Sequence, residues 1–172
     1  MSADPARFFP RRLVNAGGFA ACAGLLGFAY YLQFHEGLNP CPLCIFQRVV
    51  FMFLGLSFLA AAIHNPGRIG SRVYAVLVGV TGLTGAGIAA WHVHLQHLPP
   101  DQVPECGPGL DYMLDVFPMS ETLRMVFTGS GECAEIVWTF LGFSIPAWTF
   151  LCFIGLAVAG FLRNWLSGRE MD

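Results

Sequence analysis

Four long apolar runs constrain what this chain can fold into. They cover about residues 13–34, 43–63, 73–95 and 137–162. Each run reaches the roughly 20 residues that a helix needs to cross the hydrocarbon core of a bilayer. Because backbone polar groups inside lipid must bond within their own segment, we predict a membrane-spanning α-helix for each run.

The composition supports the same conclusion. Hydrophobic residues make up 55% of the 172 residues, charged residues make up 12%, and the mean hydropathy is +0.59. A soluble domain of this size is not expected to combine these values with a complete lack of lysine. We therefore predict a single integral membrane domain over residues 1–172, built as an all-α four-transmembrane-helix bundle.

The first run has an alternative interpretation as a cleaved signal peptide, because Arg7, Arg11 and Arg12 precede it. The apolar part of a signal peptide spans about 7 to 15 residues. The run over residues 13–34 is longer than that. Its length favours a membrane span.

The arginines are segregated along the chain. Seven of the nine lie before the first run, between the second and third runs, or after the fourth: Arg7, Arg11, Arg12, Arg68, Arg72, Arg163 and Arg169. The positive-inside rule places these segments, and therefore both termini, in the cytoplasm. The loops over about residues 35–42 and 96–136 then lie on the opposite side of the membrane, where disulfides can form.

The long loop over residues 96–136 is rich in acidic residues, and its apolar residues recur at helical spacing. We predict short helices near residues 110–117 and 119–127, the second capped by Ser120. They could lie on the membrane surface or pack on the bundle, and the sequence leaves both open. The Gly129-Ser130-Gly131 segment predicts a mobile hinge next to Cys133.

The chain has six cysteines, and their surroundings divide them into two groups. Cys22 and Cys152 fall inside apolar runs without ionic neighbours and are interpreted as small apolar fillers. Cys41, Cys44, Cys106 and Cys133 all belong to the outer loops or their borders. Cys41 and Cys44 form a Cys-x-x-Cys pair where a helix is expected to begin, near Pro42, and a helix N-terminus favours a reactive thiolate.

Gln47 and Arg48 follow Cys44 by three and four residues, so a helix places all three on one face. An arginine inside an apolar run is costly unless it reaches water or finds a partner. Arg48 could therefore contact a lipid phosphate at the membrane surface. It could equally donate to a thiolate or a carbonyl oxygen in a redox site.

Three other interpretations of the sequence are a zinc site, static structural disulfides and a transporter. A zinc site could use four cysteines, or two cysteines with two of His92, His94 and His97, although the wide spacing of Cys106 and Cys133 is unlike a zinc knuckle. Static structural disulfides are disfavoured, because closing the small Cys-x-x-Cys ring adds little stability. A transporter would need ionisable residues in mid-span, and almost none occur.

The motifs in this order resemble the disulfide-bond formation protein B (DsbB) family of bacterial inner-membrane thiol:quinone oxidoreductases. The matching residues are Cys41-Pro-Leu-Cys44 with Gln47-Arg48, the segment Trp91 to Gln96, Cys106, the segment Ser130 to Glu135, Trp138, Phe140, Leu141, Gly142, Pro146 and Trp148. They are spread over nearly the whole chain.

The resemblance implies a multi-pass protein of the inner membrane whose partner is a DsbA-like periplasmic thiol oxidase. It implies that the partner attacks Cys106 of a Cys106/Cys133 disulfide, that Cys133 attacks Cys41, and that Cys44 passes electrons to a quinone. Arg48 and His92 are expected beside a ubiquinone or menaquinone ring, with Gln47 in support. We expect no bound metal and no nucleic-acid partner.

A quinone is expected on thermodynamic grounds as well. DsbA is known to be a strong oxidant, at about −120 mV, so an ordinary protein disulfide could not reoxidise it. Two alternatives stay open: a paralogue dedicated to one substrate, and a non-enzymatic membrane scaffold whose loop is stapled by cysteines and zinc. No role is assigned to His94 or His97.

Overall fold

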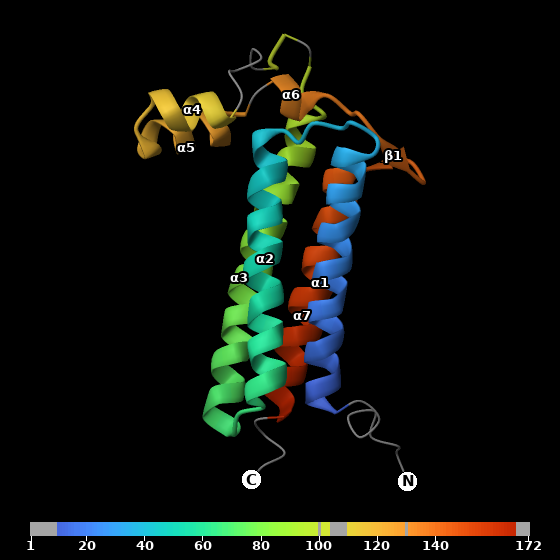
Figure 1. Cartoon of the computed structure of the whole chain (residues 1–172), viewed down its shortest axis with the longest axis vertical. Helices are drawn as coiled ribbons and strands as arrows, with labels where there is room; N and C mark the ends of the chain where they lie inside the picture. Colours follow the sequence, from blue (N-terminus) through green and yellow to red (C-terminus); the bar gives the residue numbers. More distant parts are fainter. Residues whose placement is uncertain (1–9, 100, 104–109, 130, 168–172) are drawn as a thin grey trace.

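The computed structural model describes residues 10–99, 101–103, 110–129 and 131–167. Its four long helices form one bundle: α1 (Arg11–Phe34), α2 (Pro42–His64), α3 (Arg68–Leu95) and α7 (Ile145–Ser167) (Figure 1). Among the described residues, these four helices are long and apolar enough to cross a membrane. The predicted all-α, four-helix membrane fold is confirmed.

Small residues allow the helices to approach closely. The most extensive contact in the bundle is between α3 and α7. A Cβ atom added at Gly82 would lie 2.6 Å from the Cβ of Ala157, so only glycine fits there. Next to this contact, the rings of Phe51 and Phe153 stack with their centroids 3.9 Å apart in the centre of the core. Such small-residue contacts are typical of helix packing in lipid.

A pair of buried amides joins the first and last helices. The Nδ2 atom of Asn15 donates to Oδ1 of Asn164 at 3.1 Å, and Nδ2 of Asn164 donates to Oδ1 of Asn15 at 2.9 Å. Both side chains are almost completely buried. The reciprocal bonds fix how α1 and α7 are aligned near the end of the bundle where α1 begins.

The end of the bundle at which α1 begins also carries the described arginines of the basic segments. Arg11 is the first residue of α1, Arg68 is the first residue of α3, and Arg163 lies near the end of α7. Arg11 donates to Oδ1 of Asn65 and to the Pro66 carbonyl in the turn between α2 and α3. The basic residues thus share one end, while the side of the membrane that this end faces stays a prediction.

The fourth apolar run is not entirely helical. We expected a span over residues 137–162, but α7 begins only at Ile145. Before it, β1 (Thr139–Phe140) pairs with β2 (Phe143–Ser144) as an antiparallel hairpin. Leu141 and Gly142 form the turn with φ values of 52° and 80°, the positive values that tight hairpin turns require. Hydropathy alone does not separate an apolar hairpin from the helix that follows it.

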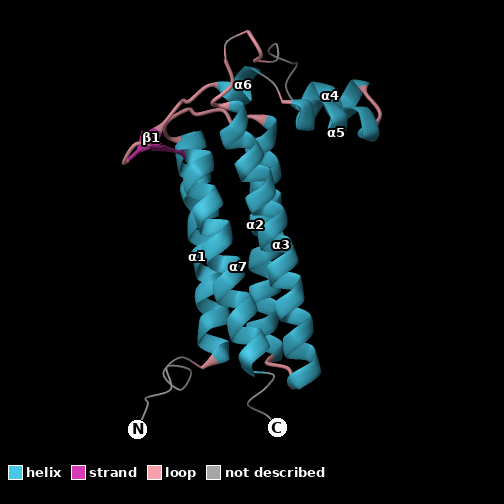
Figure 2. Cartoon of the chain, turned by 180° about the vertical axis from the view of Figure 1, so that it is seen from behind, coloured by secondary structure: helices cyan, strands magenta, loops and turns pink. Residues whose placement is uncertain are grey.

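Three short helices from the long loop lie across the other end of the bundle: α4 (Leu110–Val116), α5 (Met119–Thr128) and α6 (Gly131–Ala134) (Figure 2). The expected helices near 110–117 and 119–127 are confirmed. The expected cap at Ser120 is wrong, because α5 already begins at Met119, after Pro118, without a side-chain cap. Instead, the Thr122 hydroxyl donates to the Met113 carbonyl and ties α5 to α4.

Candidate functional site

The Cys-x-x-Cys pair lies where α2 begins. Cys41 is the residue that precedes the helix, Pro42 is its first residue, and Cys44 lies in its first turn. The two sulfur atoms are unbonded and 3.3 Å apart. Cys41 is buried, whereas Cys44 is partly exposed. The predicted helix start near Pro42 is confirmed, and it directs both thiols toward the same region.

Cys133, about 90 residues further along the chain, lies next to the Cys-x-x-Cys pair. It lies in the single turn of α6, is completely buried, and packs in one cluster with Cys41. The Sγ atoms of Cys133 and Cys41 and a ring nitrogen of His92 all lie within 4.8 Å of one another. We call Cys41, Cys44 and Cys133 the cysteine cluster. Cys106 lies outside the described residues. Its predicted role and the predicted hinge at Ser130 therefore stay predictions.

His92 is the centre of a small hydrogen-bond network. Its Nε2 atom lies 3.1 Å from the Cys133 carbonyl oxygen and 3.7 Å from the Cys41 sulfur. Its Nδ1 atom lies 3.1 Å from Nε2 of Gln47. A carbonyl oxygen can only accept, so Nε2 carries the proton of the neutral ring, and Nδ1 accepts from the Gln47 amide. The Nε2–H group therefore donates to the Cys133 carbonyl and also lies within reach of the Cys41 sulfur.

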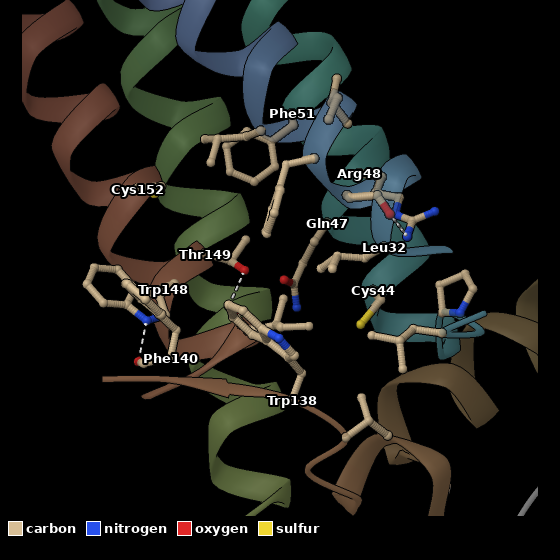
Figure 3. Close-up of a pocket in the computed structure, with 18 of the residues that line it drawn as sticks. Leu32, Cys44, Gln47, Arg48, Phe51, Trp138, Phe140, Trp148, Thr149 and Cys152 are labelled. Carbon is tan, nitrogen blue, oxygen red and sulfur yellow. Dashed lines mark hydrogen bonds between the residues drawn. The ribbon is translucent and has the colours of Figure 1, made fainter. Parts of the chain in front are cut away.

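A cavity of about 450 Å³ opens on the other side of Cys44 and Gln47. It lies between α1, α2, the hairpin and α7, as Figure 3 shows. The lining is largely apolar and aromatic, with a few polar side chains. The aromatic residues are Phe28, Phe51, Trp138, Phe140 and Trp148, and the polar ones include Cys44, Gln47, Arg48 and Thr149. This size and lining are typical of a site for a small organic molecule.

Arg48 lines this cavity and is anchored on α1. One guanidinium nitrogen donates to Oε1 of Gln33, and another donates to the Ala29 carbonyl at 3.1 Å. The guanidinium also lies over the ring of Tyr30, 5.1 Å from its centroid. These contacts hold the positive charge at the wall of an otherwise apolar space. They satisfy some of the hydrogen-bond donors of the guanidinium and fix its position beside the cavity.

The comparisons with known proteins agree with one another. The family described as "Disulfide bond formation protein DsbB" matches residues 11–162. The "Disulfide bond formation protein B" of Hahella chejuensis is 61% identical over 137 residues, which are 80% of this chain and 83% of that protein. The protein of the same name from Methylococcus capsulatus is 52% identical over 152 residues, which are 88% and 93% of the two chains. This chain belongs to the DsbB family.

Burial distinguishes the three neighbouring histidines of this DsbB family member. His92 is 2% exposed, whereas His94 and His97 are on the surface. His94 lies against the ring of Trp91, and His97, just beyond the end of α3, donates to the Val93 carbonyl in the last turn of that helix. Only His92 therefore contacts the cysteine cluster. His92 is not among the residues that line the cavity but adjoins it through Gln47, so its expected place beside a quinone stays a prediction.

Sequence reasoning missed several residues of the site. Gln33, which anchors Arg48, was visible only as a polar residue in an apolar run. Trp138 and Trp148 line the cavity, and the Trp148 indole N–H donates to the Phe140 carbonyl at 3.0 Å, which holds the hairpin against α7. Cys152 also lines the cavity, whereas Cys22 is buried in the core as predicted.

Proposed function

We propose that this protein is a membrane oxidase that reoxidises a DsbA-like periplasmic dithiol protein. Two electrons pass through the Cys106/Cys133 and Cys41/Cys44 disulfides to a membrane quinone. The observation that carries the proposal is the order of groups in space. The Cys133 sulfur lies beside that of Cys41, Cys41 lies beside Cys44, and Cys44 lines a cavity for a small molecule.

The proposed exchange begins when a partner thiolate attacks Cys106 and forms a mixed disulfide, with Cys133 leaving as a thiolate. Cys133 then attacks Cys41, which breaks the Cys41–Cys44 bond and releases Cys44 as a thiolate. The second partner thiol closes the partner's disulfide and releases Cys106. Each step forms one S–S bond and breaks one, as thiol–disulfide exchange requires.

Return to the starting state uses the same sulfur atoms. Cys106 attacks Cys133 in the Cys41–Cys133 bond, which restores the first disulfide and leaves Cys41 and Cys44 reduced. Loss of one electron pair and two protons from this pair to the acceptor restores the second disulfide. The sum is one partner dithiol oxidised for each quinone reduced.

His92 is proposed to assist at Cys41. When Cys106 attacks Cys133, the leaving group is the Cys41 thiolate, and the Nε2–H group of His92 lies 3.7 Å from that sulfur. A hydrogen bond to the charged form stabilises a leaving thiolate. Gln47 is a positioning residue in this scheme, because its bond to Nδ1 keeps the proton on Nε2.

The cavity fits a quinone head group by size and by chemistry. Its volume of about 450 Å³ and its aromatic walls suit a flat apolar ring, and its polar groups suit carbonyl oxygens. Bound there, a ubiquinone or menaquinone would accept the electron pair and the protons. Arg48 would donate to a carbonyl oxygen and stabilise negative charge that develops on it, while the Cys44 sulfur faces the same space.

We also propose that the protein is a multi-pass protein of the bacterial inner membrane with both termini in the cytoplasm. The clustering of Arg11, Arg68 and Arg163 at one end of the bundle supports this orientation through the positive-inside rule. The cysteine cluster would then face the periplasm, where a dithiol partner is found.

The proposal is tested by mixing the protein in detergent with a quinone and a reduced DsbA-like protein. Quinone reduction is measured by the change in quinone absorbance. The wild-type protein should turn over, and Cys41→Ser and Cys44→Ser should lose activity. Cys22→Ala is the matched control, because this thiol is buried in the core away from the cavity lining. Full activity in Cys44→Ser would rule the proposal out.

A zinc-stapled scaffold is the second candidate, because Cys41, His92 and Cys133 could hold a metal ion. A scaffold predicts one zinc ion in the protein as isolated and cysteines that do not react with a quinone. Metal analysis of the purified, unreduced protein separates the two candidates. The oxidase carries its cysteines as disulfides in that state and should contain no zinc.

A further inference from the structure

The cysteine cluster has the composition of a metal site as well as that of an exchange site. We propose that in the reduced protein Cys41, Cys133 and His92 bind a thiophilic divalent cation, Zn²⁺ above all, and that this cation stops electron transfer. The binding requires that the thiols are reduced, but it does not require that the protein is an oxidase. The inhibition rests on the proposed oxidase function.

The distances are close to those of a tetrahedral zinc site. With Zn–S bonds of about 2.3 Å and Zn–N bonds of about 2.0–2.1 Å, a tetrahedral centre separates sulfur from nitrogen by about 3.6 Å and two sulfurs by about 3.8 Å. The Cys41 sulfur lies 3.7 Å from Nε2 of His92. All three ligand atoms lie within 4.8 Å of one another, so a shift of about 1 Å at Cys133 completes the set.

The three ligands are held in place by different parts of the fold. Cys41 precedes α2, His92 lies in the last turn of α3, and Cys133 lies in α6. Their side chains are 7%, 2% and 0% exposed. Buried side chains from three packed elements have few alternative positions, so the entropy lost on binding a metal is small.

Gln47 supplies the outer contact that a histidine ligand needs. A metal-bound histidine usually donates its other ring N–H to an oxygen acceptor. If the Gln47 amide turns over, its Oε1 atom accepts from Nδ1, and the Nε2 lone pair becomes available to the cation. The exchange-competent state uses the opposite tautomer, in which Nε2 donates to the Cys133 carbonyl.

Cys44 is a further thiol next to the site and would supply the fourth ligand once its sulfur moves toward the other three, because it lies outside the set of mutually close ligand atoms. Its sulfur lies 3.3 Å from that of Cys41, on the side toward the cavity. Coordination by three thiolates and one imidazole is a common closed zinc set. Binding releases the protons of the thiols, because the thiolates are the ligands.

This metal site exists only while the cysteines are reduced. A sulfur in a disulfide offers no thiolate to the cation, so the oxidised cluster lacks its ligands. In the reduced cluster, the lone pairs that Cys133 and Cys41 use for exchange are engaged by the metal. The cation therefore traps the reduced state and competes with reoxidation.

Binding is tested without quinone or partner. The purified protein is reduced with a phosphine, freed of reductant, and titrated with Co²⁺ and with Zn²⁺ against a chelator. The reduced protein should bind about one Co²⁺ with the intense sulfur-to-cobalt absorption of thiolate ligands, and the oxidised protein should bind none. Equal binding in the two states, or no binding in the reduced state, overturns the proposal. The comparison uses only the wild-type protein, so it does not depend on the folding of a variant.

A matched pair of histidine variants tests the ligand assignment. His92→Gln should lower zinc affinity at least tenfold and change the Co²⁺ spectrum, whereas His94→Gln, at an exposed position two residues away, should do neither. Thermal unfolding of both variants checks that they are folded. Unchanged affinity in a folded His92→Gln protein would remove His92 from the site.

Turnover assays separate this proposal from the oxidase proposal. Zn²⁺ at saturating concentration should abolish quinone reduction, and a chelator should restore it. Absence of turnover in metal-free protein contradicts the oxidase, and leaves the binding result standing. Normal turnover in the presence of saturating Zn²⁺ contradicts the inhibition, whatever the binding measurements give.

Discussion

The side-chain amide of Gln47 in α2 lies 3.1 Å from Nδ1 of His92 in α3, and this hydrogen bond joins the cavity to the cysteine cluster. Gln47 lines the cavity, and His92 contacts the cysteine cluster. Both side chains are nearly inaccessible to solvent. A proton or a change of tautomer at one site is therefore communicated to the other through a single hydrogen bond.

Replacing Gln47 by leucine should slow the step in which Cys41 leaves the Cys41–Cys133 disulfide, and with it quinone reduction, and should leave the fold intact. The variant loses the donor that keeps the His92 proton on Nε2, so the N–H group is no longer kept within reach of the Cys41 sulfur. The loss of one buried hydrogen bond should lower the free energy of unfolding by about 1–3 kcal/mol. Stopped-flow measurement of quinone reduction gives the rate, and unfolding by denaturant gives the free energy of unfolding.

Gln47→Glu provides the comparison for this prediction. A carboxylate accepts from Nδ1–H and favours the opposite tautomer or the charged ring. Its rate should depend on pH differently from that of the wild-type protein, which a purely structural role would not produce. Identical pH profiles in the two proteins would contradict the positioning role.

Replacing Arg48 by alanine should weaken quinone use more than exchange with the dithiol partner. The variant removes a charged donor from the cavity wall, and such bonds contribute about 1.5–3 kcal/mol, or roughly tenfold to a hundredfold in the KM for quinone. Exchange between the partner and the cysteines takes place at the cysteine cluster and should change little. Separate assays of the two half-reactions check this.

Arg124→Ala is the control for Arg48, because Arg124 lies exposed on α5, outside the cavity lining. It should behave like the wild-type protein in both half-reactions. Equal losses in the two half-reactions of Arg48→Ala would contradict a role at the quinone.

The fold could be predicted from the sequence because lipid leaves few alternatives. Apolar runs such as residues 43–63 and 73–95 can satisfy their backbone only as helices, and α2 and α3 match them closely. The hairpin before α7 was missed because Phe140 and Phe143 are as apolar as the helix. Its signal was the Leu141-Gly142 pair, which adopts the positive φ values of a tight turn.

The candidate site was predicted only in part. The spacing of Cys41, Cys44 and Arg48 follows from helix geometry and needs no tertiary structure. The contacts of His92 with Cys133 and Gln47 join residues 41 and 45 positions apart in the sequence, which no local pattern specifies. The cavity likewise depends on how the hairpin packs on α7 and on how Trp138, just before the hairpin, meets Phe28 of α1.

Replacing Asn15 by leucine should destabilise the bundle. It leaves the Oδ1 atom of Asn164 buried without its donor, although Nδ2 still bonds the Gly160 carbonyl at 2.8 Å. An unsatisfied buried group costs about 1–3 kcal/mol, and interhelical bonds in membranes average about 0.6 kcal/mol. The double variant Asn15→Leu/Asn164→Leu should recover most of the loss. A double variant no more stable than the sum of the single variants would contradict the pairing.

Adding one methyl group to α3 should have opposite effects at two glycines. In Gly82→Ala the new Cβ lies 2.6 Å from Ala157 Cβ, so α3 and α7 must separate and stability should fall by about 1–3 kcal/mol. In Gly87→Ala nothing lies within 4 Å, and alanine favours a helix over glycine by up to about 1 kcal/mol. Thermal unfolding in detergent should rank Gly87→Ala at or above the wild-type protein and Gly82→Ala below it. Equal midpoints for the two variants would mean that α3 and α7 do not touch at Gly82.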